Sequence, residues 1–240
     1  MGSGTVFERY EIKYIITEKQ KELIKNGMGK YMAPDKYGRS VIRNIYYDTA
    51  DSRLIRRSNE KPVYKEKLRV RSYKRVESDD ETVFVELKKK YNSVVYKRRT
   101  VLSENTAAKW LNDGQLPQEQ TQIISEIEYF RRFYGSLVPS AFVSYDREAF
   151  FAVDGSDFRI TFDENITART TDLSLKKDVG GEKLLGNGLV LMELKTHSGI
   201  PLWMTSLLSE NEIYKTSFSK YGTAYRTMIF PEKGEIKNVC

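Results

Sequence analysis

The stretch Leu68-Arg69-Val70-Arg71 alternates apolar and basic side chains, residue by residue. Successive side chains of a β-strand point to opposite sides of a sheet, so this stretch predicts a strand with one apolar and one charged face. The stretch Val83–Lys88 repeats the pattern, with Glu86 on its charged face. We expect helices to cover the apolar faces, because such surface is unfavourable in water.

Three further stretches place charged side chains on one face. The residues that share this face are Arg9, Glu11 and Lys13; Arg159, Thr161 and Asp163; and Leu191, Glu193 and Lys195. A charged face can simply be solvated, as one side of an antiparallel sheet commonly is. Alternatively the sheet closes around its charges, and an anion or a metal held by Glu11, Glu86 and Glu193 then offsets the crowding. The alternation leaves both outcomes open.

Strands and helices are expected along most of the chain. The expected strands are 7–16, 39–48, 63–73, 82–90, 93–102, 141–153, 158–162 and 189–195. The expected helices are 17–32, 51–57, 104–112, 118–134, 201–209 and 218–230. Strands that follow one another through short turns favour antiparallel pairing and the α+β class. We expect one domain over residues 7–232, with tails at 1–6 and 233–240.

Composition narrows the function classes. Lysine and arginine number 40 against 33 acidic residues, a net charge of +7, which favours an anionic partner. One cysteine, Cys240, excludes a disulfide scaffold, and no long apolar run is present, so we expect a cytoplasmic protein. His197 is the only histidine, and no Walker-type phosphate loop occurs. A membrane-protein partner is not readable from the sequence.

Eight short motifs occur in a characteristic order. They are Tyr10-Glu11-Ile12-Lys13-Tyr14, Tyr46-Tyr47-Asp48-Thr49, Leu68-Arg69-Val70-Arg71, Glu86-Leu87-Lys88, Ser144-Tyr145-Asp146-Arg147, Arg159-Ile160-Thr161-Phe162-Asp163, Met192-Glu193-Leu194-Lys195 and Ser217-Phe218-Ser219-Lys220-Tyr221. The ordered set resembles the catalytic domain of the vacuolar transporter chaperone (VTC) complex, found in bacterial polyphosphate polymerase-like proteins of the CYTH-like, triphosphate tunnel metalloenzyme superfamily. The resemblance covers about residues 7–230.

This resemblance implies an eight-stranded antiparallel β-barrel, a triphosphate tunnel, with peripheral helices. The positions that it matches to phosphate-chain binding are Lys13, Arg69, Arg71, Lys88, Arg147, Arg159 and Lys220. Glu193 matches the glutamate that binds the metal, Mn²⁺ or Mg²⁺, and Glu86 is the second metal candidate. Secondary candidates for substrate binding are Glu11, Lys195, Ser217 and Arg98, although the register of the strand that carries Arg98 and Arg99 is not fixed.

The implied reaction transfers the γ-phosphate of ATP to a growing inorganic polyphosphate chain. Hydrolytic tunnel enzymes typically begin with two alternating glutamates before the lysine, and Arg9 stands where the first would fall. The exchange of an acid for a base favours a polymerase over a metal-dependent inorganic triphosphatase or nucleoside triphosphatase. A non-catalytic polyphosphate-binding module is a third hypothesis. A nucleic-acid partner is disfavoured, because glutamates interleave with the basic residues.

Overall fold

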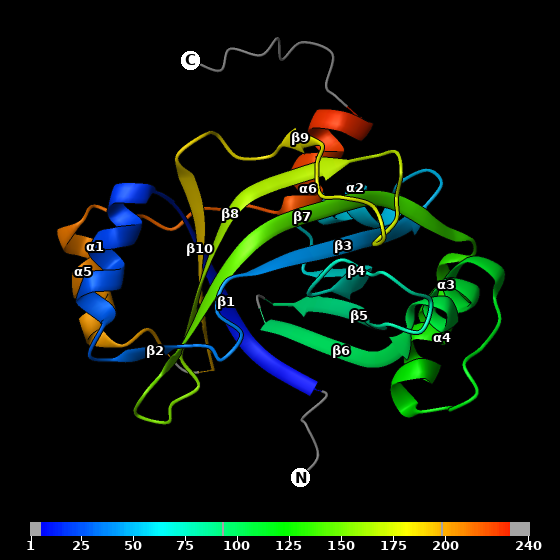
Figure 1. The fold of residues 1–240 in the computed structure, drawn as a ribbon, viewed down its shortest axis with the longest axis horizontal. Coiled ribbons are helices and arrows are strands. Elements are labelled where there is room, and N and C mark those ends of the chain that lie inside the picture. The colour runs from blue at the N-terminus through cyan, green and yellow to red at the C-terminus, as the bar shows by residue number, and fades with distance from the viewer. Residues whose placement is uncertain (1–5, 93, 198, 231–240) are drawn as a thin grey trace.

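The structure, a computed structural model, describes residues 6–92, 94–197 and 199–230 (Figure 1). The expected tails at 1–6 and 233–240 lie outside this part, apart from Val6. The side chain of Arg9 also lies outside it, so the comparison of Arg9 with a glutamate stays a prediction from sequence.

Ten strands form one antiparallel sheet. They are β1 (Val6–Thr17), β2 (Met32–Pro34), β3 (Ser40–Thr49), β4 (Tyr64–Ser72), β5 (Thr82–Tyr91), β6 (Val94–Ser103), β7 (Leu137–Ala152), β8 (Arg159–Arg169), β9 (Glu182–Lys183) and β10 (Leu189–Thr196). Their order is β2-β7-β3-β4-β5-β6-β1-β10-β8-β9, and β7 additionally pairs with β8. The eight expected strands are present. β2 and β9 were not expected, because three and two residues are too short to show an alternation.

Helices lie at the periphery of the sheet. They are α1 (Glu18–Met28), α2 (Arg53–Asn59), α3 (Glu104–Asp113), α4 (Gln122–Tyr134), α5 (Leu202–Glu210), α6 (Lys220–Ala224) and a π-helix, η1 (Tyr225–Ile229). The Thr17 side chain and Gln20 form the expected capping box, but α1 ends at Met28 and not at residue 32. Helix α4 begins only after Thr121, whose hydroxyl accepts the N–H of Ile124. The prediction of an α+β protein is therefore confirmed.

Two helix pairs cover the apolar faces of the strands. Leu68 of β4 and Val85 of β5 pack in one buried cluster with Trp110 of α3. Ile160 of β8 and Leu194 of β10 pack in another, which includes residues of α1 and α5. Figure 1 shows α1 and α5 together at one end of the sheet and α3 and α4 at the other. Burying each large apolar side chain stabilises the folded protein by about 1.5–3 kcal/mol. This stabilisation decides which face of each strand turns away from water.

Candidate functional site

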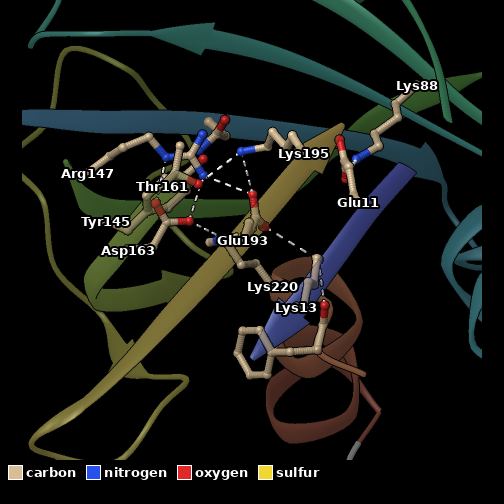
Figure 2. A network of polar contacts seen from close by, with 12 residues as sticks. Glu11, Lys13, Lys88, Tyr145, Arg147, Thr161, Asp163, Glu193, Lys195 and Lys220 are labelled. Carbon is tan, nitrogen blue, oxygen red and sulfur yellow. Dashed lines mark hydrogen bonds and ion pairs between the residues drawn. The ribbon is translucent and has the colours of Figure 1, made fainter. Parts of the chain in front are cut away.

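The charged faces of the strands bring ten cations and four carboxylates together, and we call this set the charged cluster. Figure 2 shows the part of it around Glu193. Its cations are Lys13, Lys67, Arg69, Arg71, Lys88, Lys97, Arg99, Arg147, Lys195 and Lys220, and its carboxylates are Glu11, Glu86, Asp163 and Glu193. Each strand orients its members by the same alternation that buries its apolar residues on the opposite face. Charges from seven strands and one helix therefore share a small region.

Glu193 lies among four cations. Its Oε2 is 3.0 Å from Lys195 Nζ and 3.4 Å from an Arg147 nitrogen, and its Oε1 is 3.6 Å from Lys13 Nζ and 3.5 Å from Lys220 Nζ. Burial alone would raise the pKa of Glu193, but these cations hold that pKa well below its usual range. The carboxylate is therefore ionised and offers hard oxygen atoms.

Asp163 fixes the orientation of two of these cations. Its two oxygens each accept a hydrogen bond of 2.6 Å from Arg147, and one also accepts a 2.6 Å hydrogen bond from Lys220. The Asp163 side chain is fully buried, which would raise its pKa, but Arg147 and Lys220 lower it. A carboxylate held by a two-pronged arginine contact restricts the guanidinium to one position. Asp163 thus acts as a positioning residue within the cluster.

Glu86 is the centre of a second group of ion pairs. Arg69 donates to its Oε2 at 2.7–2.8 Å, Lys97 Nζ lies 2.6 Å from its Oε1, and Arg99 and Arg71 follow at 3.4 and 3.9 Å. Its side chain is 1% exposed. Since arginine and lysine occupy both oxygens and water does not reach them, we assign Glu86 to orienting Arg69 and Arg71. The prediction that Glu86 binds metal does not agree with this arrangement.

Glu11 and Lys88 form a third contact, seen to one side of Glu193 in Figure 2. Lys88 Nζ is 2.5 Å from Glu11 Oε2. Burial raises the pKa of Glu11 and Glu193 raises it further, yet Lys88 and Lys195 outweigh both and lower it to about 2. Glu11 and Glu193 therefore present two ionised carboxylates that influence each other.

Lys67 and Lys97 are cations of the cluster that the sequence prediction missed, and Lys67 is the less compensated of the two. Its Nζ donates a 2.8 Å hydrogen bond to the Ser219 hydroxyl. Burial lowers its pKa first, then Lys13 and Lys88 lower it further, to a value well below the usual range. Water still reaches part of the side chain, as expected for the wall of a wet interior. Among the residues that the structure describes, no carboxylate pairs with Lys67, so it marks the least compensated positive charge.

The segment around α6 closes one side of the cluster. Lys13 Nζ donates a 2.7 Å hydrogen bond to the carbonyl oxygen of Phe218. The Tyr221 ring stacks on Tyr46 at 4.6 Å between centroids, and its hydroxyl donates to Asp48 at 2.9 Å. Lys220 directly precedes this anchored tyrosine, so the ammonium group of Lys220 is held beside Asp163 of β8 and Glu193 of β10.

Known proteins share the sequence profile and the fold of this chain. The sequence profile of the VTC domain matches residues 8–229, nearly the whole described chain. The chain belongs to the VTC domain family. No curated protein matches it.

Two solved structures share the fold of this VTC domain. A Bacillus halodurans protein named a "putative adenylate cyclase" superposes with a TM-score of 0.55 at 12% identity, covering 90% of this chain and 95% of its own. A Hippeastrum "putative adenylyl cyclase", described as having a dominant triphosphatase activity, gives a TM-score of 0.54 at 16% identity, covering 91% and 95%. At these identities the likeness shows a common fold. No helix within residues 6–92, 94–197 or 199–230 is long and apolar enough to cross a membrane.

The VTC domain brings most of the predicted site residues together, with three exceptions. Arg159 lies on the expected face, opposite Lys195, but it is exposed at the start of β8. The placement of Arg98 is wrong: its guanidinium donates to Glu126 of α4 at 2.7 Å, on the helix-covered side. Arg99 faces the cluster instead, because it pairs in register with Glu86.

The third exception is Ser217, which is exposed outside the contacts of the charged cluster. Two residues later the hydroxyl of Ser219 accepts the hydrogen bond of Lys67 and also that of the Gly222 N–H. Ser219 therefore takes the place that the sequence prediction gave to Ser217.

The donor set of the VTC domain suits a metal that arrives with phosphate. The described residues contain no group of three or more histidine, cysteine, aspartate and glutamate side chains placed to hold a metal. Mg²⁺ retains several waters and is commonly bound by one or two carboxylates plus the phosphates of its substrate. Glu193, assisted by Glu11, supplies that number of hard oxygens, and Mn²⁺ accepts the same ligands.

Proposed function

We propose that this VTC domain is a polyphosphate polymerase that transfers the γ-phosphate of ATP to inorganic polyphosphate, with Mn²⁺ or Mg²⁺. The observation that carries the proposal is the excess of ten cations over four carboxylates in the charged cluster. Like charges held together away from bulk water are unfavourable unless anions compensate them. A chain of phosphates supplies one negative charge or more per phosphate along its whole length.

The strand pairings support a tunnel around this cluster. β7 pairs with β3 on one side and, from Phe142 opposite Arg169 to Phe151 opposite Arg159, with β8 on the other. We propose that β1, β3–β8 and β10 thereby wrap into the eight-stranded barrel implied by the sequence. An interior open at both ends would let a phosphate chain leave as it grows.

Charge neutralisation is the main task of such a site, because both reactants are anions. Arg147 and Lys220, locked by Asp163, and Arg69 and Arg71, locked by Glu86, are donors already in position before the substrate enters. Donors that need no rearrangement stabilise developing charge more effectively than water does. The same residues would hold acceptor and donor phosphates in line, which supplies much of the remaining acceleration.

The pair Lys67 and Lys88 would take the phosphates that carry the most charge. A phosphate would give Lys67 the counter-ion that no described carboxylate of the cluster provides, so the lowered pKa of Lys67 would rise on binding. No side-chain nucleophile is needed, because a terminal oxygen of the polyphosphate attacks the γ-phosphorus and ADP leaves. A divalent metal, held by Glu193 with Glu11, would supply further neutralisation of the phosphate oxygens.

Triphosphate hydrolysis is the second candidate. The dominant triphosphatase activity described for the Hippeastrum protein of the same fold favours it. Water then replaces the polyphosphate end as nucleophile, and the same cations bind the same phosphates. Arg9 in place of an expected glutamate, and the small number of carboxylates near Glu193, support the polymerase.

Product analysis decides between these reactions. The purified protein is incubated with ATP and Mn²⁺, and polyphosphate is sought on a gel while orthophosphate is measured. We expect polyphosphate and ADP; orthophosphate as the sole product indicates the triphosphatase. Binding of tripolyphosphate without turnover of ATP indicates a binding module.

A paired substitution tests the metal role in the same assay. Glu193→Gln keeps the size of the side chain and removes its charge, so we expect it to lower the rate at least about tenfold. The control Glu126→Gln lies on α4, outside the cluster, and should retain the wild-type rate. Full activity of Glu193→Gln would remove the metal role from the proposal.

A further inference from the structure

A buried arginine, Arg43, lies on the opposite side of β3 from the charged cluster and has no partner among the residues that the structure describes. Asn44 and Tyr46 of this strand contact Arg71 and Arg69 in the cluster, so Arg43 points to the other face. Arg43 is 8% exposed, and its Nε is enclosed with no hydrogen-bond partner. Within the described part of the chain, no carboxylate forms an ion pair with its guanidinium.

A buried hydroxyl group without a partner accompanies Arg43. In the sheet register, Arg43 stands between Ser72 of β4 and Ser144 of β7. The Ser72 hydroxyl is 1% exposed and also makes no hydrogen bond. Each buried polar group left without a partner costs about 1–3 kcal/mol, and a charged group costs more. Two such groups side by side can bind acceptor atoms that the described part of the protein does not itself supply.

Two more arginines hold the loop between β8 and β9 against this place. Arg75 donates to the carbonyl of Lys176 at 2.7 Å and pairs with Asp178 at 2.7 Å. Arg169 donates to three carbonyls of the loop, those of Asp172, Ser174 and Asp178, at 2.8–3.4 Å, so each of its guanidinium nitrogens already has an acceptor. The loop is further anchored by Leu175, which is buried in the core and accepts the N–H of Val76. Arg75, Arg169 and Asp178 of this loop region lie near enough to Arg43 for their charges to act on it.

Positive charge is in excess here as well. Burial lowers the pKa of Arg43, and the nearby Arg75 and Arg169 lower it further, while Asp178 raises it. Asp172 and Asp178 face Arg169. Asp178 is paired with Arg75 and its side chain is 81% exposed, and within the described residues the Nε of Arg43 and the hydroxyl of Ser72 have no acceptor or donor partner. The unmet requirement is for acceptor atoms with negative charge.

We propose that Arg43, Arg75 and Ser72, with the positive charge of Arg169 near them, form a second oxyanion site, outside the charged cluster, that takes a phosphate group. Guanidinium groups match the oxygens of a tetrahedral phosphate, and the serine hydroxyl adds a donor. The group comes either from free orthophosphate or from the end of a polyphosphate chain. In both cases binding ties the loop between β8 and β9 to β3, β4 and β8. The site is separate from the proposed catalytic centre and does not depend on the identity of the reaction.

Calorimetric titration with orthophosphate at low salt tests the site. We compare the wild-type protein with Arg43→Gln, with Arg75→Gln and with the cluster variant Lys67→Met. Arg43→Gln and Arg75→Gln should each weaken one class of phosphate site about tenfold or more, because each removes a charge-assisted hydrogen bond. Lys67→Met should leave that class unchanged. Equal binding in the wild type and in both arginine variants would overturn the proposal.

Arg75→Gln guards against a folding artefact. The Arg75 side chain is 49% exposed, so its loss should leave the unfolding temperature nearly unchanged even if Arg43→Gln does not fold. Repeating the titration with tripolyphosphate identifies the source of the phosphate. Tighter binding of tripolyphosphate than of orthophosphate at the arginine-dependent site assigns a chain end. Tighter binding of orthophosphate assigns the free ion.

Discussion

Replacing Lys67 by methionine should make the protein more stable and less able to bind phosphate. Methionine keeps the length of the apolar stem and removes the ammonium group. That group makes one hydrogen bond, to Ser219, and its nearest charged neighbours, led by Lys13 and Lys88, are positive. Since water still reaches part of the side chain, we expect the relief to be about 1–2 kcal/mol in free energy of unfolding.

The magnitude translates into a measurable shift. For a domain of this size, 1 kcal/mol changes the unfolding temperature by about 2–4 °C, so Lys67→Met should raise it by roughly 2–8 °C in buffer without phosphate. Tripolyphosphate at a hundred times its Kd should stabilise the wild type by about 2.7 kcal/mol. A tenfold loss of affinity in the variant removes about 1.4 kcal/mol of that gain. Ligand should therefore narrow or reverse the difference between the two proteins.

Thermal unfolding followed by circular dichroism, with and without tripolyphosphate, measures both effects. The matched control is Lys74→Met, since the Lys74 side chain is 73% exposed and pairs only with Glu81. This control should shift the unfolding temperature by less than about 2 °C in either condition. The reasoning is wrong if Lys67→Met is less stable than the wild type without ligand, or if tripolyphosphate stabilises both equally.

Three further outcomes are expected. Asp163→Asn should lower the free energy of unfolding by about 3–5 kcal/mol in urea, since it leaves Arg147 and Lys220 without their buried partner, whereas Asp51→Asn at an exposed position should leave it nearly unchanged. Burial lowers the pKa of Lys195 to about 8, so tripolyphosphate affinity should fall between pH 7 and 9, and Lys195→Arg should make that fall smaller. Between pH 8 and the usual lysine pKa of 10.5 the unfolded chain holds more protons at this residue than the folded protein, so the contribution of Lys195 to the free energy of unfolding rises with pH. Removing divalent metal with a chelator should abolish ATP turnover by the wild type while leaving the unfolding temperature within about 2 °C, because Glu193 already has four cationic neighbours without metal.

Alternation made the strand faces predictable from the sequence. In Leu68–Arg71 the apolar or basic character of each residue shows which side of the sheet it faces, because side chains of a strand alternate between the two sides and the apolar side must be covered. The run Lys97-Arg98-Arg99 carries no such signal, since all three side chains are basic. Only the pairing of Arg99 with Glu86 in β5 decides which of them faces the cluster.

Contacts between distant segments were the part that the sequence could not supply. Asp163 was visible on a charged face, but its role depends on Arg147 from β7 and Lys220 from α6 arriving at the same point. The sequence also gives no sign that Arg43 is buried without a partner among the described residues, because the residues around it follow the same pattern as any other strand. Lys67 differs: it continues the alternation of Arg69 and Arg71 and could have been found.

The pairing of β1 with β10 has a consequence for how the protein is made. Tyr14 stands opposite Met192, and Lys13 also contacts Phe218. Strand β1 can therefore make these contacts only after segments much later in the sequence have been translated. Pairings between strands far apart in the sequence slow folding, because the entropy of closing a long loop is lost before the contacts between the strands stabilise the chain. A nascent chain on the ribosome therefore cannot assemble the complete charged cluster until Lys220 has been translated.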